Sequence, residues 1–544
     1  MQQGHQDFYN ALREFIPETR LITDPLRTLA YGTDASFYRL IPQIVVRASD
    51  EEEIIKIVKL ADRHNIPVTF RAAGTSLSGQ AITDSVLVQL GDGWDNYKIS
   101  DDGSTISLQP GVIGGNANKY LAPLNKKIGP DPASINTAKI GGIAANNASG
   151  MCCGTAQNSY RTLNSMRVVL ADGSVLDTAD SESIENFRRS HSVLLDSLDC
   201  LSQQTRTNDD LRERIEHKYR LKNTTGYALN SLVDYEDPID ILQHLMIGSE
   251  GTLGFISNIT YNTVDEHEHK ATALIFFNTV RTTCEAVAIL KKTPVSAVEL
   301  MDRAGLRSKE NKAGMPPFIK ELPNDAAALL VETRAADAAT LQQQVDAIAA
   351  SISGLDTTKP IEFSTDPAVN AQFWAIRKGL FPAVGAVRLT GTTVIIEDVA
   401  FPVEQLADAV HDLHQLFTKW NYSEALIFGH ALEGNLHFVF TQSFDTQAEI
   451  DRYDGLMDEV CKLVVHKYNG SLKAEHGTGR NMAPYVEMEW GADAYRLMWE
   501  LKELLDPRGI LNPGVILNKN NHVHLANLKS LPAADELVDK CIEC

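Results

Sequence analysis

The segment RAAGTSLSGQA occupies residues 71–81 and directly follows the strand-like run IPVTFR at 66–71. Its small residues let the backbone approach a ligand closely. Successive backbone N–H groups, together with the Thr75, Ser76 and Ser78 hydroxyls, suit a pyrophosphate without much positive charge. The spacing matches neither GxxxxGK[ST] nor GxGxxG, which excludes a P-loop and a Rossmann-type dinucleotide site. Taken alone, an ordinary glycine-rich turn remains the alternative.

Two further stretches of the chain share this composition. PDPASINTAKIGGIAANNASGMCCG (130–154) is rich in Gly, Ala, Ser and Asn, which suits packing of the backbone against a flat or phosphorylated ligand. In GSEGTLGFI (248–256), glycines recur at 248, 251 and 254 before strand-like residues. Ordinary turns explain one such stretch easily but not three in one domain. The sequence therefore predicts a ligand-binding domain.

Strand and helix patterns surround these stretches. QIVVRAS (43–49) and SVLVQL (85–90) predict strands. DEEEIIKIVKLADRHN (50–65) predicts a helix that starts with a capping box of Ser49 and Glu52 and has an apolar stripe of Ile54, Ile57, Val58 and Ala61. Later patterns predict a hairpin at 166–178 with Asp172-Gly173 as its turn, a helical insertion at about 184–235, and strand character at 245–264.

A second α+β unit follows this domain. Helical periodicity is found at 338–351, 403–420 and 448–470, and Gly470 is well placed to end the last helix. The β-rich stretches TTVIIEDVAF (392–401) and ALIFGH (425–430) lie between them. From about residue 519 the chain is polar, and we expect it to be loosely held.

Histidines and a carboxylate gather in two motifs of the second half. FGHALEGNLHFVF (428–440) places His430 and His437 on either side of a short polar turn, so two strands would bring both imidazoles to one edge of a hairpin. LKAEHGTGR (472–480) adds Glu475 and His476. Two His and one carboxylate suit zinc or manganese, and a His not needed as ligand is a natural general base. A core or surface position is the alternative for any lone His.

Arg377, in FWAIRKGLFP (373–382), follows a Trp on a predicted helix. A guanidinium can bind a carboxylate through two parallel hydrogen bonds. A solvated Arg on a helix surface is the alternative.

Length and composition limit the class of protein. The 544 residues predict two or three domains, and 43% apolar with 22% charged residues excludes disordered and fibrous classes. The formal net charge of −21 argues against nucleic acid as the main partner. No apolar run approaches the roughly 20 residues of a membrane-spanning helix. The N-terminus has no apolar core segment of a signal peptide, so we expect a cytosolic chain. Seven cysteines are an odd number, which argues against a disulfide framework.

Together these motifs resemble the FAD-linked oxidases of the vanillyl-alcohol oxidase type, in the D-lactate and D-2-hydroxyacid dehydrogenase branch. The resemblance runs from YGTDASFYRLIP (31–42) to LDPRGILNPGVIL (505–517), and the motifs occur in the family's order. It implies an α+β fold, with a two-subdomain PCMH-type FAD-binding domain before an α+β substrate domain. The implied boundaries are an N-terminal helical segment at 1–37, the FAD-binding domain at 38–264, the substrate domain at 265–518 and a tail at 519–544.

The resemblance also implies which residues hold FAD. The loop at 71–81 would bind the pyrophosphate, and the stretch at 130–154 would line the flavin and its ribityl chain. The stretch at 248–256 would border the cofactor, and Asn512 would approach the isoalloxazine. Some relatives attach FAD through a His beside the loop, but residues 66–150 contain none, so we expect non-covalent FAD. The residues are Arg71, Ala73, Gly74, Thr75, Ser76, Gly79, Ser134, Gly141, Gly142, Asn147, Ser149, Gly150, Glu250, Gly254, Ile256 and Asn512.

In the substrate domain the resemblance implies His430, His437 and Glu475 as ligands of a divalent metal, zinc or manganese, with His476 as the base. Arg377 matches the arginine that binds the substrate carboxylate. Relatives acting on D-2-hydroxyglutarate carry a Lys where this chain has Ile396, which favours a short monocarboxylate. The implied reaction is oxidation of D-lactate to pyruvate, with glycolate or D-2-hydroxyglutarate as alternatives. A non-catalytic flavoprotein and a metal-dependent hydrolase are rival classes.

The electron acceptor follows from what the sequence lacks. There is no NAD-binding fingerprint, so oxygen, a quinone, a cytochrome and an iron–sulfur partner are the open alternatives, and we expect a quinone, a cytochrome or an iron–sulfur relay. We expect no transmembrane segment. Peripheral contact at the inner face of a membrane and a homo-oligomer are both compatible with the sequence. Cys541 and Cys544 in LVDKCIEC resemble the start of a ferredoxin-type run for a [4Fe–4S] cluster. We expect the chain to be the flavin portion of a longer protein; an incidental CxxC is the alternative.

Overall fold

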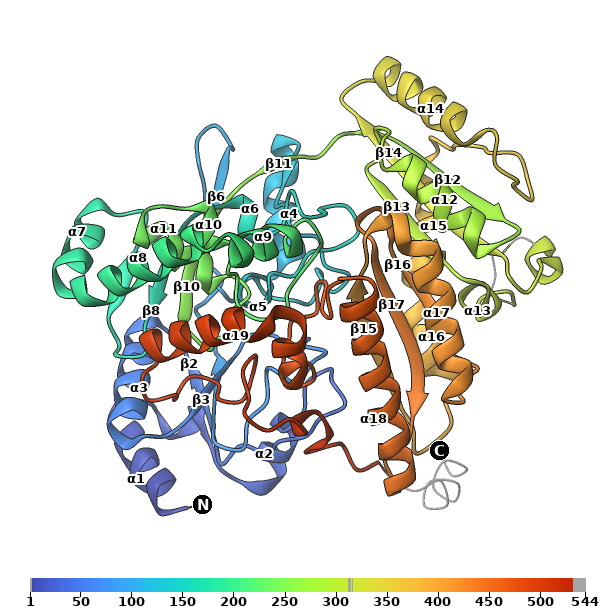
Figure 1. Ribbon diagram of the computed structural model, residues 1–544. Coiled ribbons are helices and arrows are strands. Elements are labelled where there is room, and N and C mark those ends of the chain that lie inside the picture. Colours follow the sequence, from blue (N-terminus) through green and yellow to red (C-terminus); the bar gives the residue numbers. More distant parts are fainter. Residues whose placement is uncertain (1, 312–314, 316, 532–544) are drawn as a thin grey trace. The chain divides into compact units, whose positions relative to one another are not determined.

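The computed structural model describes residues 2–311, 315 and 317–531, which fall into two compact units (Figure 1). The first unit runs to Glu266 and takes up the chain again at Glu475–Asn527. The second unit holds His267–Ala474. The segment after Ala474, which the sequence assigns to the substrate domain at 265–518, therefore packs with the first unit.

A small, mainly parallel sheet in the first unit carries the glycine-rich loop. Its strands, in spatial order, are β1 (Leu21–Ile22), β2 (Ile44–Ala48), β4 (Val86–Leu90) and β3 (Val68–Arg71). β2 and β3 both run parallel to β4, and β1 is antiparallel to β2. β2 and β4 are buried along almost their whole length, as strands covered on both faces are. The three predicted strands are confirmed.

Helix α3 (Glu51–His64) follows β2 and buries the predicted stripe of four apolar residues. Its N-cap is Asp50, whose side chain accepts the N–H of Glu53, while the Glu53 carboxylate accepts the N–H of Ser49 at 2.8 Å. The predicted capping box of Ser49 with Glu52 is therefore wrong by one residue. The run SDEEE offers the same spacing in two registers, and Arg20, 2.6 Å from Glu53, favours the observed one.

An antiparallel sheet also belongs to the first unit. Its strands, in spatial order, are β5 (Tyr97–Ile99), β6 (Thr105–Leu108), β10 (Phe255–Asn262), β8 (Leu163–Val169) and β9 (Val175–Asp177), beside a short β7 (Lys126–Lys127) and β11 (Val264–Asp265) pair. β8 and β9 form the predicted hairpin, with Gly173 of its turn at a φ of +76°. The strand predicted at 245–264 begins only at Phe255, because Leu245 and Met246 end helix α11 (Pro238–Met246).

The predicted helical insertion consists of α7 (Ser181–Ser190), α8 (Ser192–Thr207), α9 (Asp209–Lys218) and α10 (Ser231–Asp234). It starts three residues earlier than predicted, and residues 219–230 form turns and loop rather than helix. The other helices of this unit are α1 (Gln3–Leu12), α2 (Pro25–Tyr31), α4 (Gly114–Leu121), α5 (Ile140–Asn146), α6 (Ser159–Thr162) and α19 (Val486–Leu505).

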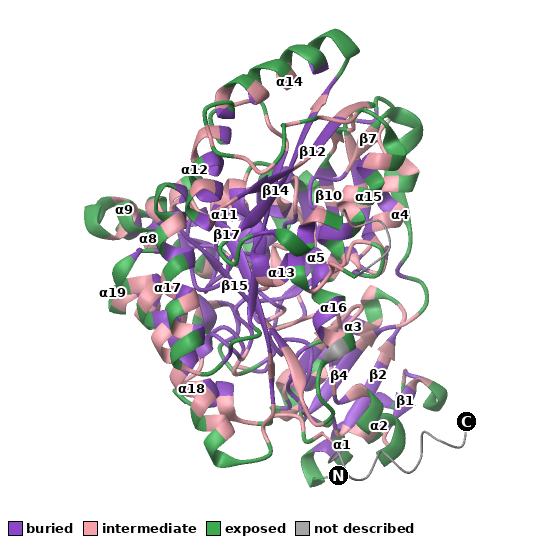
Figure 2. Ribbon diagram, turned by 90° about the vertical axis from the view of Figure 1, so that its right-hand side faces the viewer, coloured by how far each residue is buried: buried purple, intermediate pink, exposed green. Residues whose placement is uncertain are grey.

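The second unit is built on a six-stranded antiparallel sheet. The strands, in spatial order, are β12 (His269–Phe277), β14 (Ala327–Ala335), β13 (Ala297–Met301), β16 (Leu426–His430), β17 (Asn435–Gln442) and β15 (Thr393–Ala400). Most positions of these strands are buried (Figure 2). The helices are α12 (Val280–Leu290), α13 (Arg303–Arg307), α14 (Ala338–Ile352), α15 (Pro367–Lys378), α16 (Leu380–Val387), α17 (Leu406–Lys419) and α18 (Gln447–Lys462). The helices and strands predicted for this unit are confirmed, except that the helix predicted at 448–470 ends as α18 at Lys462 and is followed by a short π-helix, Leu463–Lys467.

The β16–β17 turn requires a glycine. Gly434 has a φ of +67°, and a Cβ at this position would lie 1.9 Å from the carbonyl oxygen of Phe401. The end of the last helix differs from the prediction. Asn469, at a φ of +49°, takes the left-handed position expected of Gly470, while the N–H of Gly470 donates to the carbonyl of Val464 at 2.9 Å.

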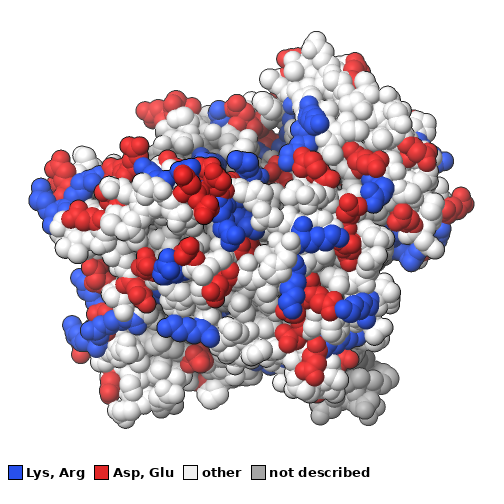
Figure 3. Space-filling view, in the orientation of Figure 1, with Lys and Arg blue, Asp and Glu red and all other residues white. Residues whose placement is uncertain are grey.

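The expectation of a loosely held chain from residue 519 is wrong for residues 523–527. Tyr38 donates its hydroxyl to the carbonyl of His524 at 2.8 Å, and the N–H of Arg39 donates to Asn527 at 2.8 Å. Cys541 and Cys544 lie outside the described residues. Within the described part of the chain, no helix combines the length and apolar character needed to cross a membrane. Acidic and basic side chains are interspersed on the face shown in Figure 3.

Candidate active site

A cluster of buried polar residues lies on the sheet of the second unit. Side chains two residues apart on a strand lie on the same face of the sheet. Three pairs are of this kind: Glu299 and Met301, His430 and Phe428, and Asp398 and Ile396. The register sets Glu299 opposite His430, and His437 opposite both Phe428 and Asp398. Neighbouring strands therefore bring four ionisable side chains together, as the sequence predicts for His430 and His437.

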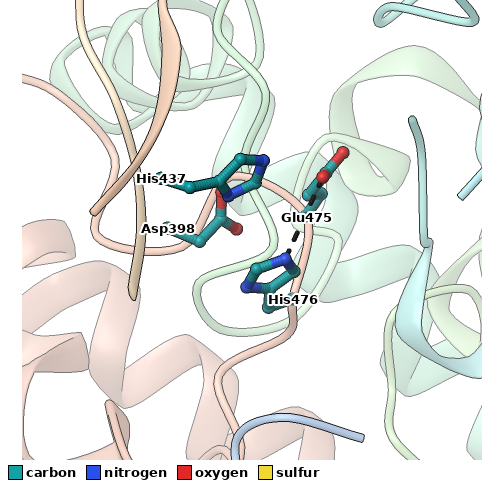
Figure 4. A group of neighbouring side chains, drawn as sticks. All are labelled: Asp398, His437, Glu475 and His476. Carbon is teal, nitrogen blue, oxygen red and sulfur yellow. Dashed lines mark ion pairs between the residues drawn. The ribbon is translucent and has the colours of Figure 1, made fainter. Parts of the chain in front are cut away.

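The two imidazoles face each other through their Nε2 atoms, which lie 3.3 Å apart. A carboxylate lies beside the other nitrogen of each ring. Glu299 Oε1 is 2.7 Å from His430 Nδ1, and Asp398 Oδ1 is 3.4 Å from His437 Nδ1. Figure 4 shows the His437 ring beside the Asp398 side chain. Asn435 orients Asp398 by donating its amide to Oδ1 at 2.6 Å.

This arrangement fits a metal site. With Zn–N bonds of about 2.0–2.1 Å, two imidazole ligands of a tetrahedral ion have nitrogens about 3.3–3.4 Å apart. The Nε2 atoms of His430 and His437 already have this separation. At His430 the carboxylate of Glu299 is hydrogen-bonded to Nδ1, which keeps the proton on that nitrogen and leaves Nε2 as the ligand atom, the usual environment of a metal-binding His.

Arg377, near the end of α15, joins the same cluster. Its Nε and Nη2 atoms both lie 2.7 Å from Glu299 Oε2, and the guanidinium stacks 4.5 Å from the centre of the Phe428 ring. The side chain is 6% exposed, so the alternative of a solvated surface Arg is wrong. Glu299 thus engages the Nε and Nη2 edge of the guanidinium, and binding of a substrate carboxylate by Arg377 stays a prediction.

Glu475 and His476 lie in the first unit, at the start of the segment that returns to it. The Glu475 carboxylate accepts hydrogen bonds at Oε2 from Ser149 Oγ at 2.9 Å and from Lys222 Nζ at 3.1 Å. His476 Nε2 lies 4.0 Å from Glu475 Oε1, the pair marked by a dashed line in Figure 4. A fixed buried carboxylate beside an imidazole suits a metal ligand next to a base.

The chain itself connects these residues to the second unit. Ala474, the last residue there, donates its N–H to the carbonyl of Asp398 at 3.4 Å. Glu475 and His476 are the next two residues in the sequence. The assignment of His430, His437 and Glu475 to one metal ion stays a prediction.

The glycine-rich loop between β3 and β4 has the features of a ligand cradle. Residues 72–77 are all half-buried, between a buried strand and the buried Ser78 and Gly79. Gly79 has a φ of +75°, and a Cβ there would lie 2.8 Å from the Tyr38 ring. Ser78 Oγ is buried without a hydrogen-bond partner among the described residues. A buried hydroxyl without a partner in a loop of small residues fits the oxygen-rich pyrophosphate of FAD.

Asn512 joins three of the segments singled out by the sequence. Its side chain accepts a hydrogen bond from Thr69 Oγ1 at 2.9 Å and donates to the carbonyls of Gln80 and Glu250, both at 2.9 Å. The Glu250 carboxylate in turn accepts the N–H of Gly479 at 2.9 Å. Asn512 and Glu250 thus hold the loop at 71–81, the stretch at 248–256 and the residues after His476 in place. These contacts show a structural role; direct contact of either residue with flavin stays a prediction.

The other predicted cofactor residues differ in their surroundings. Gly142 faces the loop, with Ala72 4.0 Å from its Cβ position, whereas Gly141 and Gly150 pack tightly against Pro110 and Asp131. Asn147 is a C-cap at a φ of +49°, and Ser134 is half-buried in the loop before α5. Arg71 donates to the carbonyl of Tyr31, and burial lowers the pKa of its guanidinium. Gly254 and Ile256 pack in the interior of the unit. Ala73, Gly74, Thr75 and Ser76 lie in the half-buried loop itself.

Sequence reasoning missed Glu299, Asp398 and Lys222 as parts of these clusters. A signal was present for the first two, because each is an acidic residue inside an apolar strand, VELM and IIEDVA. A carboxylate in such a run is buried and needs a partner. Lys222 has no comparable local signal, because its partner Glu475 lies far along the chain.

Comparison with known proteins agrees with this architecture. Residues 42–179 match the family described as FAD binding domain, and residues 266–516 match the family described as FAD linked oxidases, C-terminal domain. The fold is similar to that of p-cresol methylhydroxylase (TM-score 0.68, 14% identity, 95% of this chain and 97% of that one). It is also similar to that of alkyldihydroxyacetonephosphate synthase (TM-score 0.61, 15% identity, 93% and 85%).

Curated relatives align over most of the chain. The Bacillus subtilis glycolate oxidase subunit GlcD is 25% identical over 497 residues, 90% of this chain and 93% of its own. The mitochondrial D-lactate dehydrogenase [cytochrome] of Arabidopsis thaliana is 27% identical over 516 residues, 92% and 78%. The D-2-hydroxyglutarate dehydrogenase of Haemophilus influenzae is 23% identical over 524 residues, 92% and 50%.

These comparisons confirm the expected α+β fold, with a PCMH-type FAD-binding domain and an FAD-linked oxidase C-terminal domain. Its relatives include glycolate oxidase subunits and D-lactate and D-2-hydroxyglutarate dehydrogenases. The chain therefore belongs to the FAD-linked oxidases.

Proposed function

We propose that the protein is an FAD-dependent dehydrogenase of a D-2-hydroxyacid, and that D-lactate, oxidised to pyruvate, is its substrate. One observation carries the proposal: Glu299 contacts both Arg377 and His430 at 2.7 Å. A 2-hydroxyacid has its carboxylate and hydroxyl on adjacent carbons. An anion-binding Arg and a metal-binding His joined through one carboxylate are suited to those two groups.

The roles of the residues follow from their chemistry. Arg377 binds the substrate carboxylate through the side of its guanidinium that Glu299 leaves available, and this orients the hydroxyl. His476 accepts the hydroxyl proton at a ring nitrogen, with Glu475 beside it to stabilise the imidazolium. When bound, FAD takes up the hydride, and a divalent ion makes the hydroxyl more acidic.

The metal set we propose is His430, His437 and Glu475, with zinc or manganese as the ion. Two nitrogens and one carboxylate oxygen are ligands that both ions accept. Support comes from the 3.3 Å separation of the Nε2 atoms and from the hydrogen bonds that fix the Glu475 carboxylate. Asp398 at His437 and Glu299 at His430 serve as the partners of the Nδ1 atoms.

The apolar side chain of Ile396 supports a short substrate. Ile396 lies two residues before Asp398 on β15 and therefore on the same face of the sheet. A second substrate carboxylate at this position would meet an alkyl side chain instead of a cation. Among the described residues, Lys473 is the Lys that contacts β15, and it is paired with Glu397 at 2.7 Å. Glu397 points to the opposite face of the sheet from Ile396.

The electron acceptor we propose is a quinone, a cytochrome or an iron–sulfur partner, because the chain has no NAD-binding fingerprint. The name of the Arabidopsis relative supports a cytochrome. A cytoplasmic location, peripheral membrane contact and a homo-oligomer remain parts of this proposal.

Steady-state oxidation of a hydroxyacid panel with an artificial dye as acceptor tests the assignment. The panel holds D-lactate, L-lactate, glycolate and D-2-hydroxyglutarate. We expect the highest kcat/KM with D-lactate and essentially none with L-lactate. A preference for D-2-hydroxyglutarate or glycolate would overturn the choice of substrate. Loss of activity with every D-2-hydroxyacid, in protein that contains FAD and metal, would overturn the substrate class.

A further inference from the structure

Glu299 is a fully buried carboxylate in the middle of β13, and neither the motifs nor the family resemblance assigns it a role. Its exposed fraction is 0%. Oε2 accepts a hydrogen bond from Nε of Arg377 and lies 2.7 Å from its Nη2 in an ion pair, and Oε1 lies 2.7 Å from His430 Nδ1. A buried charge is costly unless it is paired, and Glu299 is paired on both of its oxygens.

The contact with Arg377 fixes a side chain that would otherwise have many rotamers. One hydrogen bond and one ion-pair contact to the same oxygen, with the Phe428 ring 4.5 Å away, hold the guanidinium in one plane. A guanidinium held in this way loses little further entropy when it binds a carboxylate. The same contact uses one edge of the guanidinium and so decides which edge the substrate can reach.

The contact with His430 decides the tautomer of that ring. A carboxylate can only accept, so Nδ1 must carry the proton. The Nε2 atom, which faces His437 at 3.3 Å, then keeps its lone pair for a metal ion.

We propose that Glu299 is a positioning residue that sets the orientation of Arg377 and the tautomer of His430 together, and so couples binding of the substrate carboxylate to binding of the metal. The inference rests on the proposed function, and it assigns Glu299 no contact with substrate. The side chain must accept on both sides, which only a carboxylate does.

Glu299→Gln tests this requirement, because an amide has one accepting oxygen and one donating nitrogen. Arg377 can only donate, so the amide oxygen must face Arg377 and the NH2 must face His430. His430 then accepts at Nδ1 and carries its proton on Nε2, the atom meant for the metal. We expect the zinc affinity of the metal-stripped flavoprotein, measured by calorimetric titration, to fall about 10–100-fold, and the KM for D-lactate to rise.

Two matched variants separate positioning from general damage. Glu332→Gln removes the charge of another buried glutamate of the same sheet, which accepts from Arg334 at 2.7 Å and from Trp374 at 2.6 Å. We expect its zinc affinity to stay within about threefold of wild type. Arg377→Lys keeps a cation beside Glu299, so zinc affinity should also stay within about threefold while the KM for D-lactate rises, because a Lys lacks the bidentate geometry.

The outcomes distinguish the inference from the proposed function. If the wild-type protein binds zinc and oxidises D-lactate but Glu299→Gln behaves like wild type or like Glu332→Gln, the inference alone fails. If the wild-type protein shows neither zinc binding nor activity with any D-2-hydroxyacid, the proposed function fails. Should Glu299→Gln not fold, Glu299→Asp replaces it, because a shorter carboxylate cannot span both partners. A loss of at least about threefold in zinc affinity or KM then supports the inference, and wild-type values of both overturn it.

Discussion

The Nε2 atoms of His430 and His437 lie 3.3 Å apart, and a carboxylate lies beside the Nδ1 atom of each ring. Each ring thus has an acidic residue of a neighbouring strand on the side of its Nδ1 atom. The arrangement leaves two nitrogen ligands at the separation that one tetrahedral ion requires.

Replacing His437 should remove the metal without removing the flavin. We expect His437→Ala to contain less than about a tenth of the zinc or manganese of the wild type, because one of two imidazole ligands is lost. Elemental analysis and flavin absorbance of the same sample measure both quantities. His411→Ala, at an exposed position of α17, is the control and should keep its metal. Full metal content in His437→Ala would contradict the site.

A side chain at Gly79 should weaken FAD binding. The residue has a φ of +75°, and a Cβ would come within 2.8 Å of the Tyr38 ring. The loop at 71–81 must therefore shift in Gly79→Ala, which moves the backbone N–H groups away from a bound pyrophosphate. We expect purified Gly79→Ala to hold less than half of the wild-type flavin per chain. Gly354→Ala, where a Cβ meets open space, should hold the wild-type amount; equal flavin in the two variants would refute this role of the loop.

Buried and exposed ion pairs of the second unit should differ in their contribution to stability. Lys473 and Glu397 lie 2.7 Å apart with side chains 1% and 0% exposed, whereas Lys419 and Glu459 form an exposed pair. Lys473→Met leaves a buried carboxylate without its cation and should lower the free energy of unfolding by about 3–5 kcal/mol. Lys419→Met should change it by less than about 1 kcal/mol. Urea denaturation compares the two, and similar losses would contradict the burial of the first pair.

Stability should fall between pH 6.5 and pH 4 through His244. Burial lowers the pKa of His244 to about 4, against an ordinary value of 6.5, and its ring stacks 3.9 Å from that of Tyr235. Below pH 6.5 the unfolded chain takes up a proton that the folded chain takes up only near pH 4. The free energy of unfolding therefore decreases over this window, by at most about 3.4 kcal/mol, and levels off below it.

His244→Phe keeps an aromatic ring against Tyr235 and removes the titration. The difference in unfolding free energy between wild type and His244→Phe should therefore depend on pH only between about 4 and 6.5. A constant difference across this range would show that His244 does not titrate in this way.

Local patterns predicted much of the fold. The stripe of Ile54, Ile57, Val58 and Ala61 and the hairpin that joins His430 to His437 depend on periodicity and turn chemistry within a few residues. The predicted N-cap of α3 was wrong by one residue because Ser49 and Asp50 both have a Glu three residues later. Contacts of Arg20 with Ser49 and Glu53, 29 and 33 positions away, separate the two registers.

Long-range contacts explain what the sequence did not predict. Glu299 meets His430 across 131 positions of the chain, through the register of β13 and β16. Asn512 meets Thr69 across 443 positions, and contacts of this kind return residues 475–527 to the first unit. Periodicity carries no information on either pairing. For Glu299, the acidic residue inside an apolar strand was the one local signal.

Reduction of the bound flavin by D-lactate in the absence of oxygen tests the central claim most directly. Loss of absorbance at the flavin maximum reports transfer of hydride from the substrate, without any electron acceptor. We expect D-lactate to bleach the wild-type flavin rapidly, L-lactate to leave it oxidised, and His476→Ala to bind FAD but bleach at least about 10²-fold more slowly. An oxidised flavin in the wild-type, metal-loaded protein after addition of D-lactate, or a wild-type rate in His476→Ala, would contradict the account.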